Sequence, residues 1–313
     1  MSSAAEQDPA DVFAAERGLL FGVAYRVLGR VADAEDVVQE AWLRWSAADR
    51  SDVAEPRGFL VTITTRLAID RLRLASARRE SYVGPWLPEP LVTSPGLTTP
   101  DVAEEVEVAE TVSMAMLVVL ETLSPLERAV FVLREAFAYS YAEIATILDR
   151  GEPAVRQLAH RAREHVRAAG PRFETDQATR RTATERFLRA CGDGDLEGLL
   201  GILAPDVTLI GDGGGLAKAP LRPIIGADKV ARFMLAIAAT GAPAGERYLL
   251  HLAPVNGAPG FVISADGGPV AAFDLVVVDG RIQTVHLIAN PEKLTGLRDL
   301  PDPAATLGGD HSP

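Results

Sequence analysis

Basic and polar side chains gather near the middle of the chain, in a stretch whose chemistry suits nucleic acid. They are Arg156, Gln157, His160, Arg161, Arg163 and Arg167. A guanidinium group forms paired hydrogen bonds with a guanine edge or a phosphate, and a glutamine amide can do so with adenine. The alternative is an amphipathic helix whose basic face is only solvated. The predicted structure on either side of this stretch distinguishes that interpretation from nucleic-acid binding.

Two helix signals place this stretch in a helix-turn-helix. Ser124 and Glu127 have the spacing of a capping box that begins one helix, and Ser140 and Glu143 have the same spacing, which predicts a helix over residues 140–148. The sequence DRG that follows makes a short turn, and Pro153 begins a second helix that runs to about residue 168. Two helices joined by a glycine-containing turn, the second of them basic, are typical of a DNA-binding motif.

The second helix has an apolar inner side and a basic outer side. Its inner residues recur at helical spacing: Val155, Ala159, Ala162 and Val166. Arg156 and Arg161 are then left facing outward, where they can read base edges in the major groove. Arg163 and Arg167 are placed to hold phosphate. DNA binding is therefore the favoured interpretation of this segment.

The N-terminal part predicts a compact domain of three helices. Helical periodicity covers residues 11–50 with a turn at 29–33, and Pro56 begins a third helix that runs to about residue 79. The third helix carries arginines that we expect to grip a DNA strand, namely Arg66, Arg71, Arg73 and Arg78.

The second helix of this domain presents an acidic and polar face. It consists of Asp33, Glu35, Asp36, Gln39 and Glu40. One interpretation is a docking surface for a basic partner, whose complementary charge sets orientation and association rate. The other is that the charges serve solubility alone.

A proline-rich linker is expected over residues 82–110, because its prolines prevent a long helix. It also carries Trp86, Leu87 and Leu91, which are large apolar side chains that a flexible spacer lacks. We therefore expect this linker to dock on a neighbouring domain.

Beyond a second, shorter linker the pattern changes to that of an α+β domain with a curved antiparallel sheet. The expected helices and strands cover residues 182–191, 207–210, 226–239, 248–252, 260–264 and 270–278. Asp279-Gly280 has the sequence of a two-residue hairpin turn. The tail from about residue 298 is expected to lack a fixed structure.

Polar residues of this domain admit a functional and a structural interpretation. The run Asp212, Gly213, Gly214 and Gly215 favours a tight turn over a phosphate cradle, because no helix start with a Lys-Ser/Thr pair follows it. His251 and His286 each fit a satisfied core histidine better than a cavity-lining one. The hairpin turn would place His286 on one sheet face with Phe273, Leu275, Val277, Ile282 and Thr284. We find no convincing acid–base pair, so we predict no enzyme and no cofactor.

Bulk properties set further limits. A chain of 313 residues suggests two or three domains. The net charge of −12 is a whole-chain average, and DNA binding needs only a local basic surface. The single cysteine, Cys191, excludes an intramolecular disulfide and a multi-thiolate metal site. We expect no membrane segment and a cytoplasmic protein, because no apolar run nears the roughly 20 residues of a span and no signal peptide is evident.

The helical segments resemble regions of the sigma-70 superfamily. Residues 33–40 (DAEDVVQE) followed by Trp42 are similar to the helix that binds core RNA polymerase. Residues 67–73 (LAIDRLR) are similar to the helix that contacts the −10 promoter element, and residues 123–163 to the domain that reads the −35 element. The spacing resembles the extracytoplasmic-function (ECF) group. The resemblance implies core RNA polymerase and promoter DNA as partners.

A narrower resemblance is to ECF sigma factors with a fused SnoaL-like domain, whose cone-shaped α+β fold is shared with nuclear transport factor 2 and ketosteroid isomerase. Three motifs carry it: WLPEP at 86–90, DGGG at 212–215 and NPEKL at 290–294. The resemblance implies that this domain regulates the sigma half in cis, and a small-molecule ligand in its cavity is a further candidate partner. The residues assigned to this interdomain role are Trp86, Leu87, Pro88, Glu89, Pro90, Asp212, Gly213, Gly214, Gly215, Asn290, Pro291 and Lys293.

We therefore interpret the chain as an ECF sigma factor. Its expected parts are two sigma domains (10–81 and 111–170), the linker at 82–110, a SnoaL-like domain (179–297) and the tail. One alternative is a cyclase, isomerase or hydrolase fused to a DNA-binding region, which a buried Asp or His beside a polar cavity would favour. Another is a helix-turn-helix repressor with a ligand-sensing domain. That alternative requires a dimer and leaves the acidic helix unexplained.

Overall fold

The computed structural model describes residues 8–49, 53–79, 81–92, 112–169, 176–240, 247–265, 268–297 and 300–307. These residues form two compact units. The first unit combines the N-terminal helices with the helical residues between 116 and 169, so the two expected sigma domains share one unit. The second combines residues 81–92 and Ser113–Ala115 with the C-terminal part. None of the described helices is long and apolar enough to cross a membrane.

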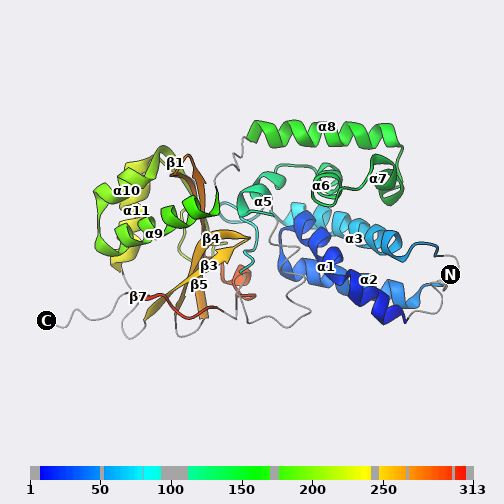
Figure 1. Cartoon of the computed structure of the whole chain (residues 1–313), viewed down its shortest axis with the longest axis horizontal. Coiled ribbons are helices and arrows are strands. Elements are labelled where there is room, and N and C mark those ends of the chain that lie inside the picture. Colours follow the sequence, from blue (N-terminus) through cyan, green and yellow to red (C-terminus); the bar gives the residue numbers. More distant parts are fainter. Residues whose placement is uncertain are drawn as a thin grey trace. The chain divides into compact units, whose positions relative to one another are not determined.

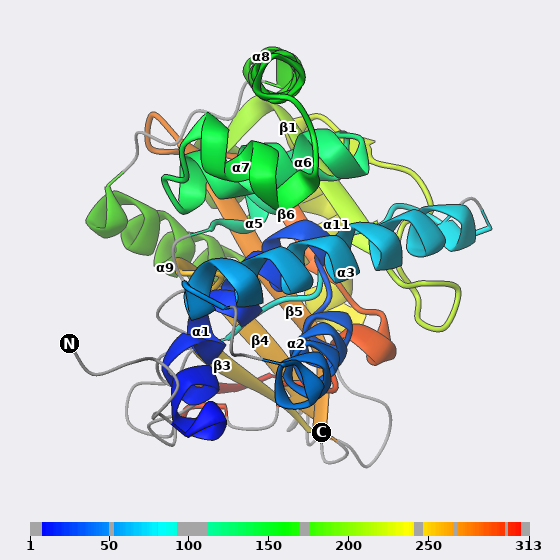
Figure 2. The same cartoon turned by 90° about the vertical axis from the view of Figure 1, so that its right-hand side faces the viewer.

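Three helices form the N-terminal part of the first unit: α1 (Pro9–Leu28), α2 (Val31–Ala47) and α3 (Pro56–Arg79). Helix α1 begins where the Asp8 side chain accepts a hydrogen bond from the backbone N–H of Ala10, at 2.9 Å. It ends at Gly29, whose φ of 72° is the left-handed conformation that glycine adopts without strain. The predicted three-helix arrangement is confirmed, and Figure 2 shows these helices in blue.

The rest of the first unit is also helical. It contains α5 (Met114–Leu120) from Met116 onward, α6 (Pro125–Phe131), the π-helical turn η1 (Val132–Ala136), α7 (Tyr141–Leu148) and α8 (Glu152–Ala169). Both predicted capping boxes are present, with Ser124 and Ser140 as the N-cap residues. Asp149, at a φ of 53°, ends α7 and turns the chain into α8. The predicted helix-turn-helix is therefore confirmed.

The described part of the second unit contains a seven-stranded sheet in the order β2-β1-β6-β5-β4-β3-β7. The strands are β1 (Leu203–Asp212), β2 (Ile224–Ile225), β3 (Tyr248–Val255), β4 (Ala258–Ala265), β5 (Gly268–Val278), β6 (Arg281–Ile288) and β7 (Ala305–Leu307). Helices α9 (Gln177–Asp193), α10 (Leu196–Ile202) and α11 (Ala227–Thr240) lie on one side of it (Figure 1). The α+β class is confirmed, but the sheet is not wholly antiparallel, because β1 pairs with β6 in parallel.

Some boundaries differ from those expected. Helix α9 begins before residue 182 because Asp176 caps it, accepting from the N–H of Thr179 at 2.9 Å. Helix α10, which the sequence pattern missed, is capped in the same way by Asp195. The tail that was expected to lack a fixed structure contains β7, which pairs with β3.

The register of the β5–β6 hairpin corrects the predicted position of His286. Asp279 and Gly280, with φ values of 49° and 74°, form the expected turn. Strand β6 then contains a bulge, because Val277 pairs with Ile282 but Val276 pairs with Thr284. A bulge moves all later residues to the other sheet face. Thr284 and His286 therefore lie opposite the core face that carries Phe273, Leu275, Val277 and Ile282.

Candidate nucleic-acid interface and linker-binding site

Helix α8 presents the basic surface that its sequence predicts. Its inner residues Val155, Ala159 and Ala162 are buried, and Val166 is half-buried. Its outer residues Arg156, Gln157, His160, Arg161 and Arg167 are exposed, and Arg163 is half-buried. The helix therefore places a row of hydrogen-bond donors at the surface.

The arginines of this surface are held by neighbouring groups. Arg161 donates through Nε to Glu127 Oε1 at 2.8 Å, and Arg163 donates to Glu135 Oε1 at 2.9 Å. Arg156 pairs with Glu152, and Arg167 with Glu164 at 3.2 Å. Tyr141 lies under the Arg156 guanidinium, 4.6 Å from ring centroid to Cζ, and its hydroxyl accepts from Arg163 at 2.9 Å. These pairs orient the guanidinium groups, and a phosphate must compete with carboxylates for them.

Glu127 both completes the capping box at the start of α6 and pairs with an arginine of α8. Burial acts to raise the pKa of Glu127, but hydrogen bonds from Ser124 and Arg161 outweigh it, so the pKa lies below its usual value. The carboxylate is consequently ionised near neutral pH and binds the Arg161 guanidinium.

The arginines of α3 have different environments. Arg71 donates through Nε to Asp33 Oδ1 at 3.0 Å and through Nη2 to Asp36 Oδ2 at 2.5 Å. Arg73 pairs with Asp70 one turn away, at 3.0 Å. Arg66 donates to the backbone carbonyl oxygen of Ile147 at the end of α7, at 2.8 Å. Arg78 lies in α3, but its side chain is outside the described residues.

The remaining residues of the acidic face of α2 bind other arginines or face solvent. Glu35 pairs with Arg17 at 2.8 Å, and Glu40 with Arg44 at 2.6 Å. Gln39 is exposed. The face is therefore accessible. Of its five residues, all of which the structure describes, only Asp33 and Asp36 pair with an arginine that is expected to bind DNA, namely Arg71.

One buried contact in the first unit was missed by sequence reasoning. Arg128 is almost fully buried, donates to the backbone carbonyl of Arg26 at 2.9 Å and pairs with Glu121 at 2.8 Å. It connects the α6 segment with α1. A lone arginine in a helix gives no sign of such a contact.

In the second unit, the Asp212–Lys293 pair binds the backbone of the linker at Leu87. Both charged side chains are fully buried and lie 2.6 Å apart, Nζ to Oδ2. The backbone N–H of Leu87 donates to Asp212 Oδ2 at 2.8 Å, and Lys293 Nζ donates to the Leu87 carbonyl oxygen. The same ammonium group lies 3.1 Å from the centre of the Trp86 ring. One buried ion pair thus satisfies both polar backbone groups of a linker residue.

Tyr82 extends this network, although the sequence analysis did not single it out. Its hydroxyl donates to Asp212 Oδ1 at 2.5 Å and accepts from Asn290 Nδ2 at 2.8 Å. Burial, and then the neighbouring carboxylate, raise the pKa of Tyr82, so the hydroxyl keeps its proton near neutral pH. Gly214 is needed beside it, because a Cβ there would lie 2.4 Å from Asn290 Nδ2 and 2.9 Å from the Tyr82 oxygen.

The rest of the linker motif is also enclosed. Leu87, Pro88, Glu89 and Pro90 are buried. At its end, the N–H of Asn256 donates to the Leu91 carbonyl oxygen at 2.7 Å, and the N–H of Leu91 donates to Asn256 Oδ1 at 3.2 Å. Asn256-Gly257 is a hairpin-turn sequence, so this contact point could have been marked as a turn in advance. Pro291 begins the short 3-10 turn η2 (Pro291–Lys293) that positions Lys293.

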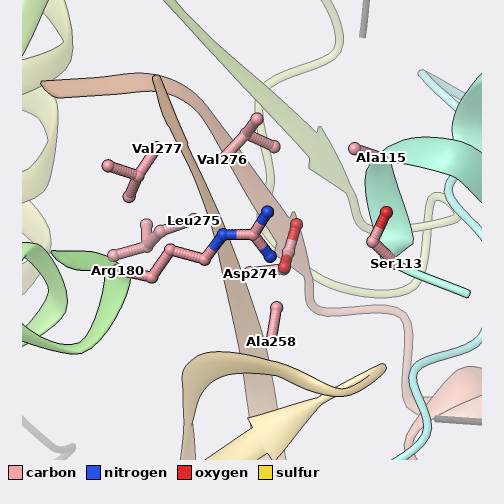
Figure 3. Close-up of a pocket in the computed structure, with 8 residues that line it drawn as sticks. All are labelled: Ser113, Ala115, Arg180, Ala258, Asp274, Leu275, Val276 and Val277. Carbon is pink, nitrogen blue, oxygen red and sulfur yellow. The ribbon is translucent and has the colours of Figure 1, made fainter. Parts of the chain in front are cut away.

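A buried acid–histidine pair lies on the sheet face opposite the helices. His286 Nδ1 bonds Asp274 Oδ2 at 2.8 Å, and both side chains are 3% exposed. Asp274 also lines a pocket with Arg180, whose guanidinium reaches toward the carboxylate while Ser113 and Ala115 lie across from it (Figure 3). The cavity volume is about 20 Å³, room for about one water molecule. His251, which bonds Ser264 and the Pro301 carbonyl oxygen at 2.7 Å each, is a satisfied buried histidine.

The chain matches two family models. They are Sigma-70 region 2 over residues 12–78 and Sigma-70, region 4 over residues 113–166. The three-helix group and the helix-turn-helix thus define a protein of the sigma-70 class.

Curated relatives extend the match to the C-terminal unit. The chain is 42% identical over 292 residues to the ECF RNA polymerase sigma factor SigJ of Mycobacterium tuberculosis, covering 91% of this chain and 92% of that one. It is 32% identical over 313 residues to the probable ECF RNA polymerase sigma factor SigI of the same species, covering 97% and 99%. The crystal structure of SigJ superposes with a TM-score of 0.75 at 40% identity, covering 92% of this chain and 98% of that one. The chain therefore belongs to the ECF RNA polymerase sigma factor family.

Proposed function

We propose that this sigma factor is controlled in cis by its own C-terminal domain, which holds the linker between sigma regions 2 and 4. The observation that supports this most directly is the buried Asp212–Lys293 pair, which binds both the N–H and the carbonyl oxygen of Leu87. Burying two charges is costly unless they are paired and hydrogen-bonded, so such a pair makes a contact geometrically specific.

The consequence for transcription follows from promoter geometry. The −10 and −35 elements have a set spacing, so the two regions that read them must reach a matching separation. Fixing residues 82–92 on the C-terminal domain restricts the connection between these regions. Attachment and release of the linker would therefore select between arrangements that fit a promoter and arrangements that do not.

We assign the following roles in the sigma half. Asp33, Glu35, Asp36, Gln39 and Glu40 dock on a basic surface of core polymerase. Arg66, Arg71, Arg73 and Arg78 hold the strand at the −10 element. The outer face of α8 reads the −35 element through Arg156, Gln157, His160 and Arg161, while Arg163 and Arg167 hold phosphates.

Run-off transcription with purified core polymerase tests the proposal. Trp86→Ala removes the ring against Lys293 and should shift transcript yield, whereas Lys229→Met changes an exposed side chain of α11 away from the linker and should match wild type. Loss of transcription in the absence of this protein establishes the sigma activity itself. Equal yields from wild type and Trp86→Ala would refute control through the linker.

A catalytic C-terminal domain is the second candidate, and the buried Asp274–His286 pair beside a polar pocket favours it. The cavity volume of about 20 Å³ argues against it, because an organic substrate needs several hundred Å³. We infer that the pair has a structural role. His286→Gln should then leave transcription unchanged, and any turnover of a small-molecule substrate lost in this variant would support the enzyme instead.

A further inference from the structure

Residues proposed for two different partners are bound to each other in the first unit. Asp33 and Asp36, which belong to the polymerase-docking face, both accept hydrogen bonds from Arg71, which belongs to the DNA-binding helix. The Arg71 side chain is 35% exposed and that of Asp36 is 57% exposed, so solvent and partners reach this cluster. Phosphates and basic side chains can therefore compete with the pairs that the structure holds.

We propose that Asp33 and Asp36 withhold Arg71 from DNA in the free protein, and that core polymerase releases it by binding these carboxylates. The inference rests on the proposed roles of the three residues. The Arg71 guanidinium lies between two carboxylates, and Arg30 Nε is 3.9 Å from Asp33, so these four charges cancel and leave no excess positive charge to attract a phosphate. A basic polymerase side chain that takes over the carboxylates leaves the guanidinium free to bind one.

This arrangement makes the two binding events reciprocal. If polymerase binding raises the affinity of the protein for DNA, DNA must raise its affinity for polymerase by the same factor. Exposed ion pairs are individually weak, so displacement is easy and the coupling is modest. Free sigma factor would then avoid non-specific DNA without losing the contact once polymerase is bound.

The same helix provides a matched control. Glu35 and Glu40 pair with Arg17 and Arg44, neither of which is assigned to DNA. Asp33→Asn with Asp36→Asn, and Glu35→Gln with Glu40→Gln, each remove two negative charges from α2. Any effect of overall charge on DNA affinity is therefore common to both double variants.

The experiment measures binding of a labelled single-stranded oligonucleotide to the full-length protein without polymerase, at several salt concentrations. The aspartate double variant should bind roughly threefold to tenfold more tightly than the glutamate double variant. Its salt dependence should be steeper by about one phosphate contact, a slope change of roughly 0.7. Adding Arg71→Gln to both double variants should abolish the difference.

Equal affinities for the two double variants, or a difference that survives Arg71→Gln, would overturn the inference. A pull-down with core polymerase at low salt then tests the docking role separately, and the aspartate double variant should bind polymerase more weakly. Unchanged polymerase binding by the aspartate double variant would refute both the docking role and the release step. The oligonucleotide titration tests separately whether Asp33 and Asp36 withhold Arg71 from DNA. Thermal unfolding confirms that all variants are folded.

Discussion

Replacing Lys293 by methionine is expected to detach the linker from the C-terminal domain. The Lys293 side chain is 1% exposed and that of Asp212 is 0% exposed, so the change leaves a buried carboxylate without its cation. Removing one partner of a buried ion pair costs about 3–5 kcal/mol. Asp212 keeps its hydrogen bonds from Tyr82 and Leu87, which places the expected cost near the lower end, at about 3 kcal/mol.

This loss of free energy should appear as local opening of the contact between the linker and the C-terminal domain, and not as unfolding of the whole domain, because release of the linker lets water reach Asp212. Hydrogen exchange at the Leu87 amide, which donates to Asp212, reports this opening directly. A loss of about 3 kcal/mol corresponds to roughly 150-fold faster exchange. Lys229→Met, at an exposed position of α11, is the matched control and should change stability by less than about 0.5 kcal/mol.

The reasoning also predicts how the pair behaves as a unit. Asp212→Leu in the Lys293→Met background removes the uncompensated charge, so the double variant should be destabilised less than the sum of the single changes. Unchanged exchange at Leu87 in Lys293→Met would refute the account of linker binding, as would additive effects in the double variant.

Three further predictions concern other parts of the molecule. Arg161→Ala should lose about 1–3 kcal/mol of discrimination at one base pair of the −35 element, whereas Arg167→Ala should weaken binding to all sequences alike and reduce the dependence of affinity on salt concentration. A binding titration over promoter variants at several salt concentrations separates these outcomes. An intact base preference in Arg161→Ala would show that the residues assigned to base reading are wrong. Burial raises the pKa of Cys191 to about 12, so at pH 8 only on the order of one thiol in 10,000 is ionised. Alkylation of Cys191 should therefore be slow until denaturant is added, and rapid labelling of the folded protein would contradict this. Gly214→Ala places a Cβ 2.4 Å from Asn290 Nδ2 at a φ of 60°, so it should lower the unfolding temperature and speed amide exchange in the linker, and wild-type behaviour would contradict the need for glycine.

Local signals in the sequence predicted local structure well. The capping boxes at Ser124 and Ser140 and the turn at Asp279-Gly280 are present as expected, because each depends on residues within four positions of one another. The face of His286 was predicted wrongly because a bulge in β6 adds a residue that no hydrophobic alternation announces. The parallel pairing of β1 with β6 escaped prediction for a related reason, since pairing partners far apart in the chain leave no periodic trace.

For the candidate sites too, the features that depend on neighbouring residues were predicted, and those that depend on residues far apart in the chain were not. Helical spacing was enough to place Val155 and Ala159 inward, and so to leave the arginines of α8 outward. The pairing of Arg71 with Asp33 spans 38 positions and that of Lys293 with Asp212 spans 81, so only the fold brings them together. Family resemblance marked the linker and glycine motifs as interdomain residues, but it did not reveal that a buried ion pair binds the linker backbone.

The most direct test of control through the linker is run-off transcription by the Lys293→Met protein with saturating core polymerase. The account predicts a transcript yield different from wild type, shifted in the same direction as that of Trp86→Ala, because both changes release the same contact. Lys229→Met should give the wild-type yield. A wild-type yield from Lys293→Met, in a protein whose Leu87 amide has lost its protection, would contradict the claim that holding the linker controls this sigma factor.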